Sequence, residues 1–294
     1  MTNSQSIVRL RLDLSYDGTD FSGWALQPGR RTVQAEVTRA LGTVLRLEPP
    51  PRVQVAGRTD TGVHATGQVA HVDVPAPAWE SVTAGRAGPV RKLAGVLPPD
   101  VRIHAIAPAP PHFDARFGAQ WRRYVYRLCD APGGGSPLRR HDTVDHPRAL
   151  DAEAMAAAAA PLVGLHDFAA YCRAREGATT VRELQTCTVQ RSGDVVRVEV
   201  RADAFCHSMV RSLVGALLAV GERRKEVGWP ASLLALRGRS PDVTVAPARG
   251  LTLVEVGYPP PDQFAARAAR TRAVRPPVPS ADPPTSEHPG SGDA

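Results

Sequence analysis

Two segments of the chain alternate strictly between apolar and polar residues. Every second position is apolar in residues 8–14 (V-R-L-R-L-D-L) and again in residues 196–200 (V-R-V-E-V). A period of two indicates a strand with one buried and one polar face, which is most common in antiparallel sheets. Shorter apolar runs predict further strands, at 51–56, 67–74, 101–107, 121–129, 184–191 and 250–258.

Helical periodicity appears between these strands. Residues 32–46 place apolar side chains at positions 33, 37, 41, 44 and 45, a spacing that lines one face of a helix. Similar patterns predict helices at 79–96, 151–162 and 207–221. Strands and helices interleaved in this way, with antiparallel character, predict the α+β class.

Two regions rich in small residues and proline divide the chain. The stretch 130–137 (D-A-P-G-G-G-S-P) has the composition of a linker and predicts an N-terminal α+β half at 1–130 and a C-terminal α+β half at 131–258. Residues 259–294 contain nine of the 28 prolines and too few apolar residues for a packed core. They are predicted to form a largely disordered tail, in which a short helix at 264–274 is the one element allowed.

Charge points to a polyanionic partner. The formal net charge is +7, and the four arginines of the tail (267, 270, 272, 275) balance its four acidic residues (262, 282, 287, 293). The positive excess is therefore assigned to residues 1–258. The N-terminus lacks the pattern of a signal peptide, and the longest apolar run, 213–220, is far shorter than the ~20 residues of a spanning helix. A cytoplasmic protein that does not cross a membrane is expected.

The four cysteines are Cys129, Cys172, Cys187 and Cys206. They form no C-x-x-C pair and have no paired histidine spacing. This argues against a zinc site and against a disulfide scaffold, and it fits a reducing compartment.

Residues 56–65 (A-G-R-T-D-T-G-V-H-A) carry the clearest chemical signal. Asp60 lies two residues after Arg58, in a turn bounded by Gly57 and Gly62. An adjacent guanidinium favours the ionised form of a carboxylate, and a fixed, ionised Asp suits covalent or acid–base chemistry. The alternative is a turn Asp that bonds to its own backbone.

Two more segments combine basic residues with apolar surroundings. A strand at 122–128 puts Arg122, Tyr124 and Tyr126 on one face, where Tyr could stack on a base and Arg could meet phosphate; a core Tyr with solvated Arg is the alternative. Arg211 lies in the almost wholly apolar helix 207–221, so it must either find an anion or extend its side chain to water.

Six blocks, in order, resemble the tRNA pseudouridine synthase A family. The most specific block, G-R-T-D-T-G-V-H-A at 57–65, is similar to the active-site signature of that family. The others are Y-D-G-T-D-F-S-G-W at 16–24, F-D-A-R-F at 113–117, R-Y-V-Y at 123–126, F-C-H-S-M-V-R at 205–211 and G-L-T-L-V at 250–254. Together they cover roughly residues 7 to 258.

This resemblance implies a fold and an activity. The two halves would form one continuous, mainly antiparallel sheet, flanked by helices and crossed by a central RNA-binding cleft. The protein would isomerise uridine to pseudouridine at positions 38, 39 and 40 of the tRNA anticodon arm, as a homodimer and without cofactor or metal.

The resemblance also assigns roles to residues. Asp60 would be the essential carboxylate, which attacks C1′, adds to the uracil ring or abstracts a ribose proton. Arg58 would fill the space left by the flipped nucleotide, and Arg211 would pair with Asp60. Tyr124 would pack against the target uracil and assist proton transfer. His64 is interpreted as structural, because the family chemistry needs no imidazole.

Several positions are candidates for weaker roles. For tRNA contact these are Phe113, Arg116, Phe117, Arg173 and Arg175, and for the uracil pocket Leu251 and Leu253. The family more often has His where Asp114 stands, so the resemblance assigns Asp114 no role.

Two other functions fit single features. Asp60-Thr61-Gly62 matches the D-T-G of aspartic proteases, but those enzymes need two such carboxylates sharing a proton, and this chain has one D-T-G. A non-catalytic tRNA chaperone would keep the fold, but it would not need Asp60, Tyr124 and Arg211 together.

Overall fold

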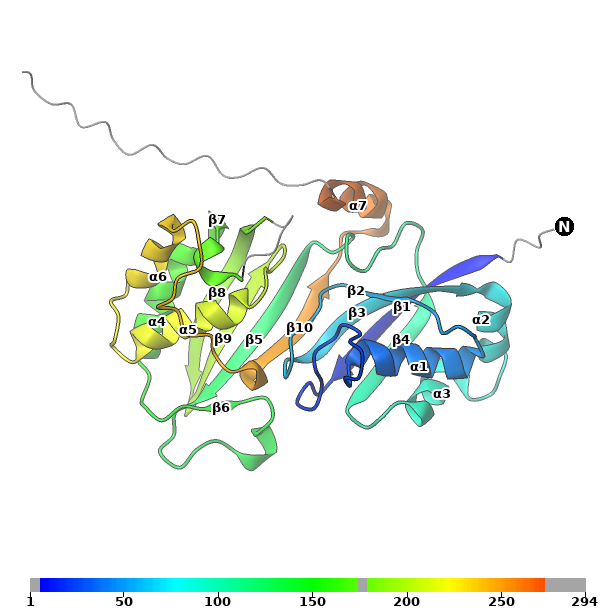
Figure 1. Cartoon of the computed structure of the whole chain (residues 1–294), viewed down its shortest axis with the longest axis horizontal. Helices are drawn as coiled ribbons and strands as arrows, with labels where there is room; N and C mark the ends of the chain where they lie inside the picture. The colour runs from blue at the N-terminus through cyan, green and yellow to red at the C-terminus, as the bar shows by residue number, and fades with distance from the viewer. Residues whose placement is uncertain (1–5, 174–178, 273–294) are drawn as a thin grey trace, which may run out of the picture.

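The computed structural model describes residues 6–173 and 179–272. A 10-stranded mixed sheet runs through them (Figure 1), with its main path in the order β4-β1-β3-β10-β5-β9-β8-β7. The strands of the first part of the chain are β1 (Ile7–Tyr16), β2 (Val53–Val55), β3 (His64–Pro75), β4 (Val101–Pro108) and β5 (Trp121–Cys129). Those of the second part are β6 (Val144–Asp145), β7 (Gly164–Asp167), β8 (Val181–Ser192), β9 (Val195–Ala202) and β10 (Leu251–Gly257).

The last strand joins the two parts of the sheet. β10 pairs with β3 in parallel, with Thr252 opposite His64, and with β5 in antiparallel orientation, with Leu253 opposite Tyr124. The other pairings along the main path are antiparallel. The predicted α+β class and the continuous, mainly antiparallel sheet are therefore confirmed.

Helices lie in two groups, on either side of β5 and β10 (Figure 1). One group holds α1 (Val33–Leu45), α2 (Ala76–Thr83) and α3 (Gly88–Val96); the other holds α4 (Ala152–Ala159), α5 (Met209–Gly221) and α6 (Trp229–Ser232). α1 begins at Thr32, whose hydroxyl accepts a hydrogen bond from Ala35 N, as N-cap residues do. Its buried Val33, Val37 and Leu41 recur at every fourth position, which puts them on one face.

The predicted helix 79–96 is two helices in the structure. α2 ends at Thr83 and α3 begins at Gly88. Gly88 has a φ of 58°, which is outside the right-handed helical region, and Pro89 stands in the first turn of α3, where its missing N–H costs nothing. The hydrophobic pattern of the sequence also does not predict β6, β7 or α6.

The structure describes the first part of the predicted tail, up to Arg272. Residues after Gly257 form a 3-10 turn at Pro261–Gln263 and the helix α7 (Phe264–Arg272), within the range where a short helix was allowed. The ring of Phe264 is only 4% exposed, because it packs against Phe113 at a centroid distance of 5.5 Å. Phe264 thus helps to dock a short helix in a segment whose overall composition does not predict a packed core.

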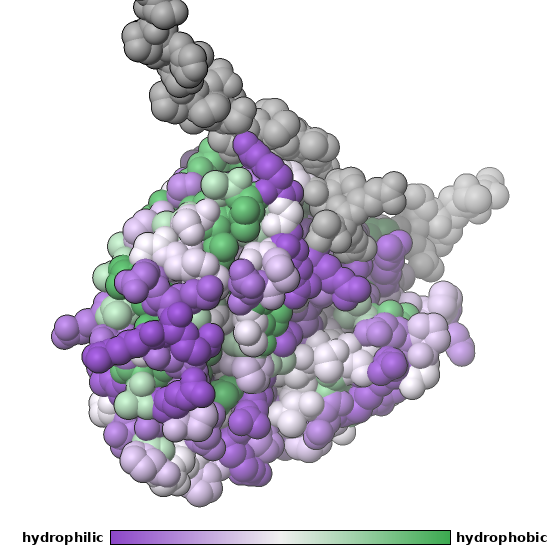
Figure 2. Space-filling model, turned by 60° about the vertical axis from the view of Figure 1, so that its left-hand side comes forward, coloured by the Kyte–Doolittle hydropathy of each residue, from purple (hydrophilic) through white to green (hydrophobic). Residues whose placement is uncertain are grey.

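The proposed division at residue 130 stays a prediction. The sheet continues across this position, because β5 precedes it and pairs with β9 and β10, which both follow it. No helix within the described ranges has both the length and the apolar character needed to cross a bilayer. Over the face seen in Figure 2, hydrophilic side chains predominate and hydrophobic ones form small separate patches.

Candidate active site

The Asp60 loop (residues 56–63) connects β2 to β3 and is fixed by the segment that follows β1. Trp24 N donates to Thr59 O at 3.0 Å, and Gly62 N donates to Phe21 O at 3.3 Å. The hydroxyls of Tyr16 and Thr59 are 2.8 Å apart in the buried interior. Two sequence blocks that are far apart in the chain are thus packed into one unit.

Glycine is required at two positions of this unit. Gly62 has a φ of 77°, a left-handed conformation that glycine adopts without steric cost. At Gly23, with a φ of 87°, a Cβ would lie 2.8 Å from Thr59 O, too close for any other side chain. The backbone on both sides of Asp60 therefore approaches its neighbours more closely than side chains would allow.

A buried arginine ties three loops together. Arg122 is 8% exposed, and its Nη2 donates to Ala56 O at 2.7 Å and to Arg116 O at 2.8 Å, while Nη1 donates to Asp203 O at 2.8 Å. Burial lowers the pKa of Arg122. The sequence analysis placed Arg122 correctly beside Tyr124 on the strand, but its guanidinium holds loops and does not face solvent.

The Asp60 carboxylate makes no hydrogen bond to its own loop among the described residues. Its side chain is 34% exposed and lines a cleft. Asp114 behaves in the opposite way, because its Oδ1 accepts hydrogen bonds from Arg116 N and Phe117 N, both at 2.8 Å. Asp114 is a turn Asp of the kind considered as the alternative for Asp60, and Asp60 is not.

The charged partner of the Asp60 carboxylate differs from the prediction. His207 Nε2 lies 3.6 Å from Asp60 Oδ1, whereas neither Arg58 nor Arg211 forms an ion pair with Asp60 in the described structure. Arg211 Nε instead donates to Ala246 O at 2.6 Å. The predicted pairing of Arg211 with Asp60 is therefore corrected: Arg211 lines the same cleft, but it bonds to a backbone carbonyl. The position of His207 in the block 205–211 was the available signal.

The cleft has a volume of about 1330 Å³ and is strongly basic. Its charged lining consists of two aspartates, Asp60 and Asp203, His207, and eight arginines: Arg52, Arg58, Arg116, Arg122, Arg182, Arg211, Arg267 and Arg270. A concave surface with this excess of guanidinium groups attracts polyanions, because clefts lined by one sign of charge focus the field.

Tyr124 lies in the wall of this cleft. The residue is 7% exposed, and its ring meets Phe205 edge to face at 5.2 Å. Burial raises the pKa of Tyr124, and the nearby Tyr16 and Asp60 raise it further. Its hydroxyl is therefore protonated at neutral pH and can donate a hydrogen bond.

The candidates for tRNA contact separate by burial. Phe113 is 0% exposed and enclosed by the rings of Tyr258 and Phe264. It is not part of the cleft lining, and its contact with tRNA stays a prediction. Arg116 is exposed, and both Arg116 and Phe117 line the cleft.

The remaining candidates lie in different surroundings. Arg173 is exposed, and its backbone N–H donates to His207 O; Arg175 lies outside the described residues. Leu251 lines the cleft with an exposure of 5%. Leu253 is 0% exposed, lies opposite Tyr124 on the neighbouring strand and is not part of the lining, so its role in a uracil pocket stays a prediction.

His64 is not part of the cleft lining. Its Nδ1 lies 3.0 Å from Gly18 N, and its Nε2 lies 3.0 Å from Arg249 O. The ring is buried and links the Gly18 turn to the segment before β10. This arrangement agrees with the structural interpretation of His64.

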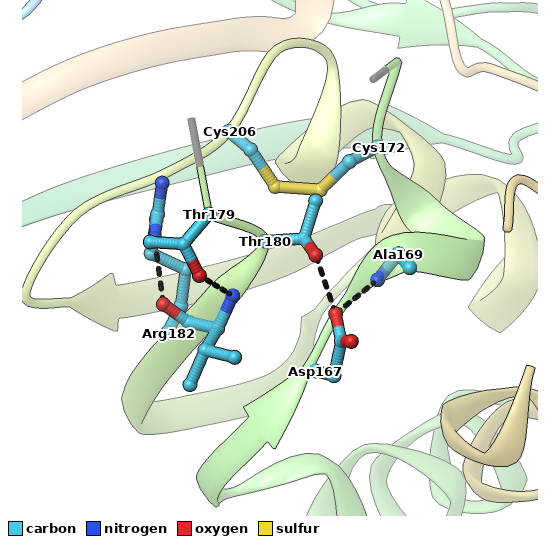
Figure 3. The surroundings of a disulfide bond; sticks show 8 residues. Asp167, Ala169, Cys172, Thr179, Thr180, Arg182 and Cys206 are labelled. Carbon is cyan, nitrogen blue, oxygen red and sulfur yellow. Dashed lines mark hydrogen bonds between the residues drawn. A yellow bond between two sulfur atoms is a disulfide. The ribbon is translucent and has the colours of Figure 1, made fainter. Parts of the chain in front are cut away.

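Two cysteines beside the cleft form a disulfide, which corrects the expectation of unpaired thiols. Cys172 and Cys206 are bonded across a sequence separation of 34, with Cα atoms 5.8 Å apart, whereas Cys129 and Cys187 are free and buried. Figure 3 shows the bond near Asp167, whose carboxylate accepts hydrogen bonds from Ala169 N and Thr180 Oγ1. Spacing in sequence gave no sign that these two loops meet.

No metal site is assigned, since no group of three or more His, Cys, Asp or Glu side chains in residues 6–173 and 179–272 is arranged to hold an ion. The basic cleft is lined by the protonated Tyr124 and by the Asp60 carboxylate, which is not hydrogen-bonded to its own loop in the described structure. This is an arrangement for acid–base or nucleophilic chemistry on a polyanion.

Comparisons with known proteins agree with this chemistry and define the class. Residues 158–259 match the family model described as tRNA pseudouridine synthase, so the class is that of the RNA-modifying isomerases. A protein of Frankia casuarinae named tRNA pseudouridine synthase A is 63% identical over 279 residues, which cover 94% of this chain and 99% of that protein.

Two further relatives bear the same name. The Streptomyces griseus protein is 56% identical over 91% of this chain and 94% of its own length, and the Mycobacterium leprae protein is 52% identical over 93% and 97%. The chain belongs to the tRNA pseudouridine synthase A family.

Proposed function

We propose that this enzyme isomerises uridine to pseudouridine at positions 38, 39 and 40 of the tRNA anticodon stem-loop, with Asp60 as the essential carboxylate. The observation that carries the proposal is the state of Asp60. Its carboxylate is not used by its own loop, and it faces a cleft whose lining includes eight arginines. A structural turn Asp would bond to its own loop, as Asp114 does.

The reaction breaks the C1′–N1 bond, turns the uracil and joins C5 to C1′. A base that reacts in this way must first leave its stack. Arg58 is exposed at the rim of the Asp60 loop, a position that suits a side chain replacing the extruded nucleotide. Tyr124 and Phe205 supply an aromatic wall for the uracil, and the protonated hydroxyl of Tyr124 is available for proton transfer.

The proposed electrostatics of the site involve His207 as well as the arginines. His207 Nε2 lies 3.6 Å from Asp60 Oδ1, within the distance of an ion pair. A partly exposed pair of this kind contributes about 1 kcal/mol at most. His207 is therefore assigned a supporting role, and Asp60 the chemistry.

The test separates chemistry from binding. Asp60→Asn keeps the shape of the side chain and removes the charge, so release of tritium from tRNA labelled at C5 of uridine should fall to the detection limit. Filter binding of the same tRNA should hold or increase slightly, because repulsion toward phosphate is removed. Asp194→Asn, at the exposed tip between β8 and β9, is the matched control and should behave as wild type.

The outcomes distinguish the alternatives. Tritium release by Asp60→Asn at a rate near wild type would reduce Asp60 to a turn residue. A wild-type protein that binds tRNA but releases no tritium would point to the chaperone function. Mapping pseudouridine in tRNA treated with the enzyme checks the positions. If the enzyme converted uridines elsewhere in the tRNA and none at positions 38, 39 and 40, that part of the proposal would be overturned.

The family resemblance also leads us to propose a homodimer working in the cytoplasm. Light scattering on the purified protein should give twice the mass of one chain. A mass of one chain at the concentration of full activity would contradict the dimer, and fractionation of cells of the source organism checks the location.

A further inference from the structure

The C-terminal helix α7 is firmly docked on the body of the protein. Phe264 and Ala268, one turn apart, are 4% and 7% exposed. The Phe264 ring meets Phe113 at 5.5 Å, and Phe113 in turn meets Tyr258 at 5.0 Å. This cluster of aromatic rings anchors a nine-residue helix that would be unstable alone in water.

A guanidinium sets the orientation of the helix. Arg267 donates from Nε and Nη2 to Ala119 O, at 3.2 and 2.9 Å, and from Nη2 to Gln120 O at 3.4 Å. These carbonyls immediately precede β5, so α7 is tied to the start of the strand that carries Tyr124. The aromatic anchor and this contact together leave the helix little freedom to rotate.

The orientation turns basic and polar side chains toward the cleft. Arg270 and Thr271 follow Arg267 by three and four residues, which puts each of them beside Arg267 on the helix surface. All three belong to the lining of the cleft that contains Asp60. Arg270 is exposed. α7 therefore contributes two of the eight arginines of the cleft.

We propose that α7 is a tRNA-binding element, in which Arg270 contacts the phosphate backbone, while the Thr271 hydroxyl donates to Arg267 O within the helix. This inference rests on the proposed function, because it takes tRNA as the occupant of the cleft. The acidic residues that balance the charge of the tail in the sequence lie mostly beyond residue 272, so α7 itself presents positive charge where the balanced total hides it.

The location of α7 determines which part of the RNA it meets. β10 ends at Gly257, opposite Trp121 at the start of β5, and α7 follows that end of the strand (Figure 1). Tyr124 is three residues further along β5. Three residues of strand span about 10 Å. α7 thus contacts backbone flanking the target nucleotide and not the uracil itself, so its loss should affect binding far more than the chemical step.

Arg270→Ala tests this contact by its salt dependence. Loss of one phosphate contact changes the slope of log K against log [salt] by about 0.7–0.9. If the variant and the wild type bind equally at 1 M salt, the Kd of the variant at 0.1 M salt is then roughly five- to eightfold higher than that of the wild type. We expect filter binding of tRNA to Arg270→Ala to weaken by this factor at 0.1 M salt and to approach wild type as the salt rises. kcat for tritium release should remain within about twofold.

Arg91→Ala is the matched control, because Arg91 is an exposed arginine on the helix α3 and outside the cleft lining. It should leave Kd and the salt slope unchanged, and Arg270→Glu should weaken binding more than Arg270→Ala. Equal Kd and equal slope for Arg270→Ala, Arg91→Ala and wild type would overturn the assignment of α7. The binding measurement does not depend on turnover. If the wild-type protein released no tritium, the proposed reaction would be contradicted, but the Kd values would still decide whether α7 binds RNA.

Discussion

Asp60 and Asp114 occupy similar turns, and their surroundings give them different roles. The Asp114 carboxylate is held by two backbone N–H groups. The Asp60 loop is held instead by its backbone, through Thr59 O and Gly62 N, which bond to Trp24 N and Phe21 O in the segment after β1, and the Asp60 carboxylate faces the cleft. The sequence predicted the importance of Asp60 through its block of glycines and charges. It could not predict that His207 would be its neighbour, because that contact depends on how two distant loops pack.

Arg122 provides the sharpest test at the residue scale. Arg122→Lys keeps the charge but loses the planar fork that reaches three carbonyls, so buried acceptors in three loops lose their donors. We expect a loss of about 2–4 kcal/mol in the free energy of unfolding, measured by urea denaturation, together with a lower kcat under conditions where the variant is folded.

The control for this variant is Arg148→Lys. Arg148 has a side-chain exposure of 63%, so exchanging it for Lys should change stability by less than about 0.5 kcal/mol. If Arg122→Lys unfolded at the same urea concentration as Arg148→Lys, the carbonyl contacts of Arg122 would not be what holds the three loops.

At the scale of elements, periodicity worked wherever an element has one buried face. β5 has the bounds 121–129 in both sequence and structure, and β1, β9 and α1 differ from prediction by few residues. Elements of two to four residues, such as β6 and β7, carry too few positions for a period. The hydrophobic pattern also could not predict that β10 lies between β3 and β5, because the neighbours of a strand are set by tertiary pairing.

The junction between β5 and β8 predicts a dependence of stability on pH. Arg191, in β8, forms a two-pronged pair with Asp130 at 2.8 and 2.6 Å, which is the main reason that the pKa of Asp130 falls from 3.8 to about 2. A lowered carboxyl pKa stabilises the fold above pH 4, and this contribution is lost as the pH falls from 4 through 2.

Asp130→Asn should therefore lower the free energy of unfolding at pH 7 by about 1–2 kcal/mol, a range reduced for the water that reaches Arg191. In urea titrations, the gap between variant and wild type should narrow between pH 4 and pH 2. Asp242→Asn, at an exposed position, is the control. A gap that is constant over this range would show that the loss arises from packing and not from the charge.

At the scale of the whole molecule, the net charge of a sequence segment did not show where the basic surface lies, whereas the positions of the charged side chains in the structure do. The region after residue 258 has no net charge in the sequence, yet α7 turns Arg267 and Arg270 into the cleft. The +7 of the chain indicated a polyanionic partner correctly. Only the packing of Phe264 reveals that part of the basic surface comes from beyond the two predicted halves.

Two truncations test whether α7 belongs to the folded body. Ending the chain after Pro259 removes Phe264 and Arg267, and it should cost about 2–4 kcal/mol of unfolding free energy through the emptied aromatic site, together with weaker tRNA binding. Ending it after Arg272 keeps both anchors and should match the full chain in urea denaturation, since residues 273–294 have few residues suited to a core. Phe264→Ala in the full chain isolates the anchor and should reproduce most of the stability loss. If the chain ending at Pro259 were as stable as the chain ending at Arg272, the docking of α7 would contribute nothing to the fold.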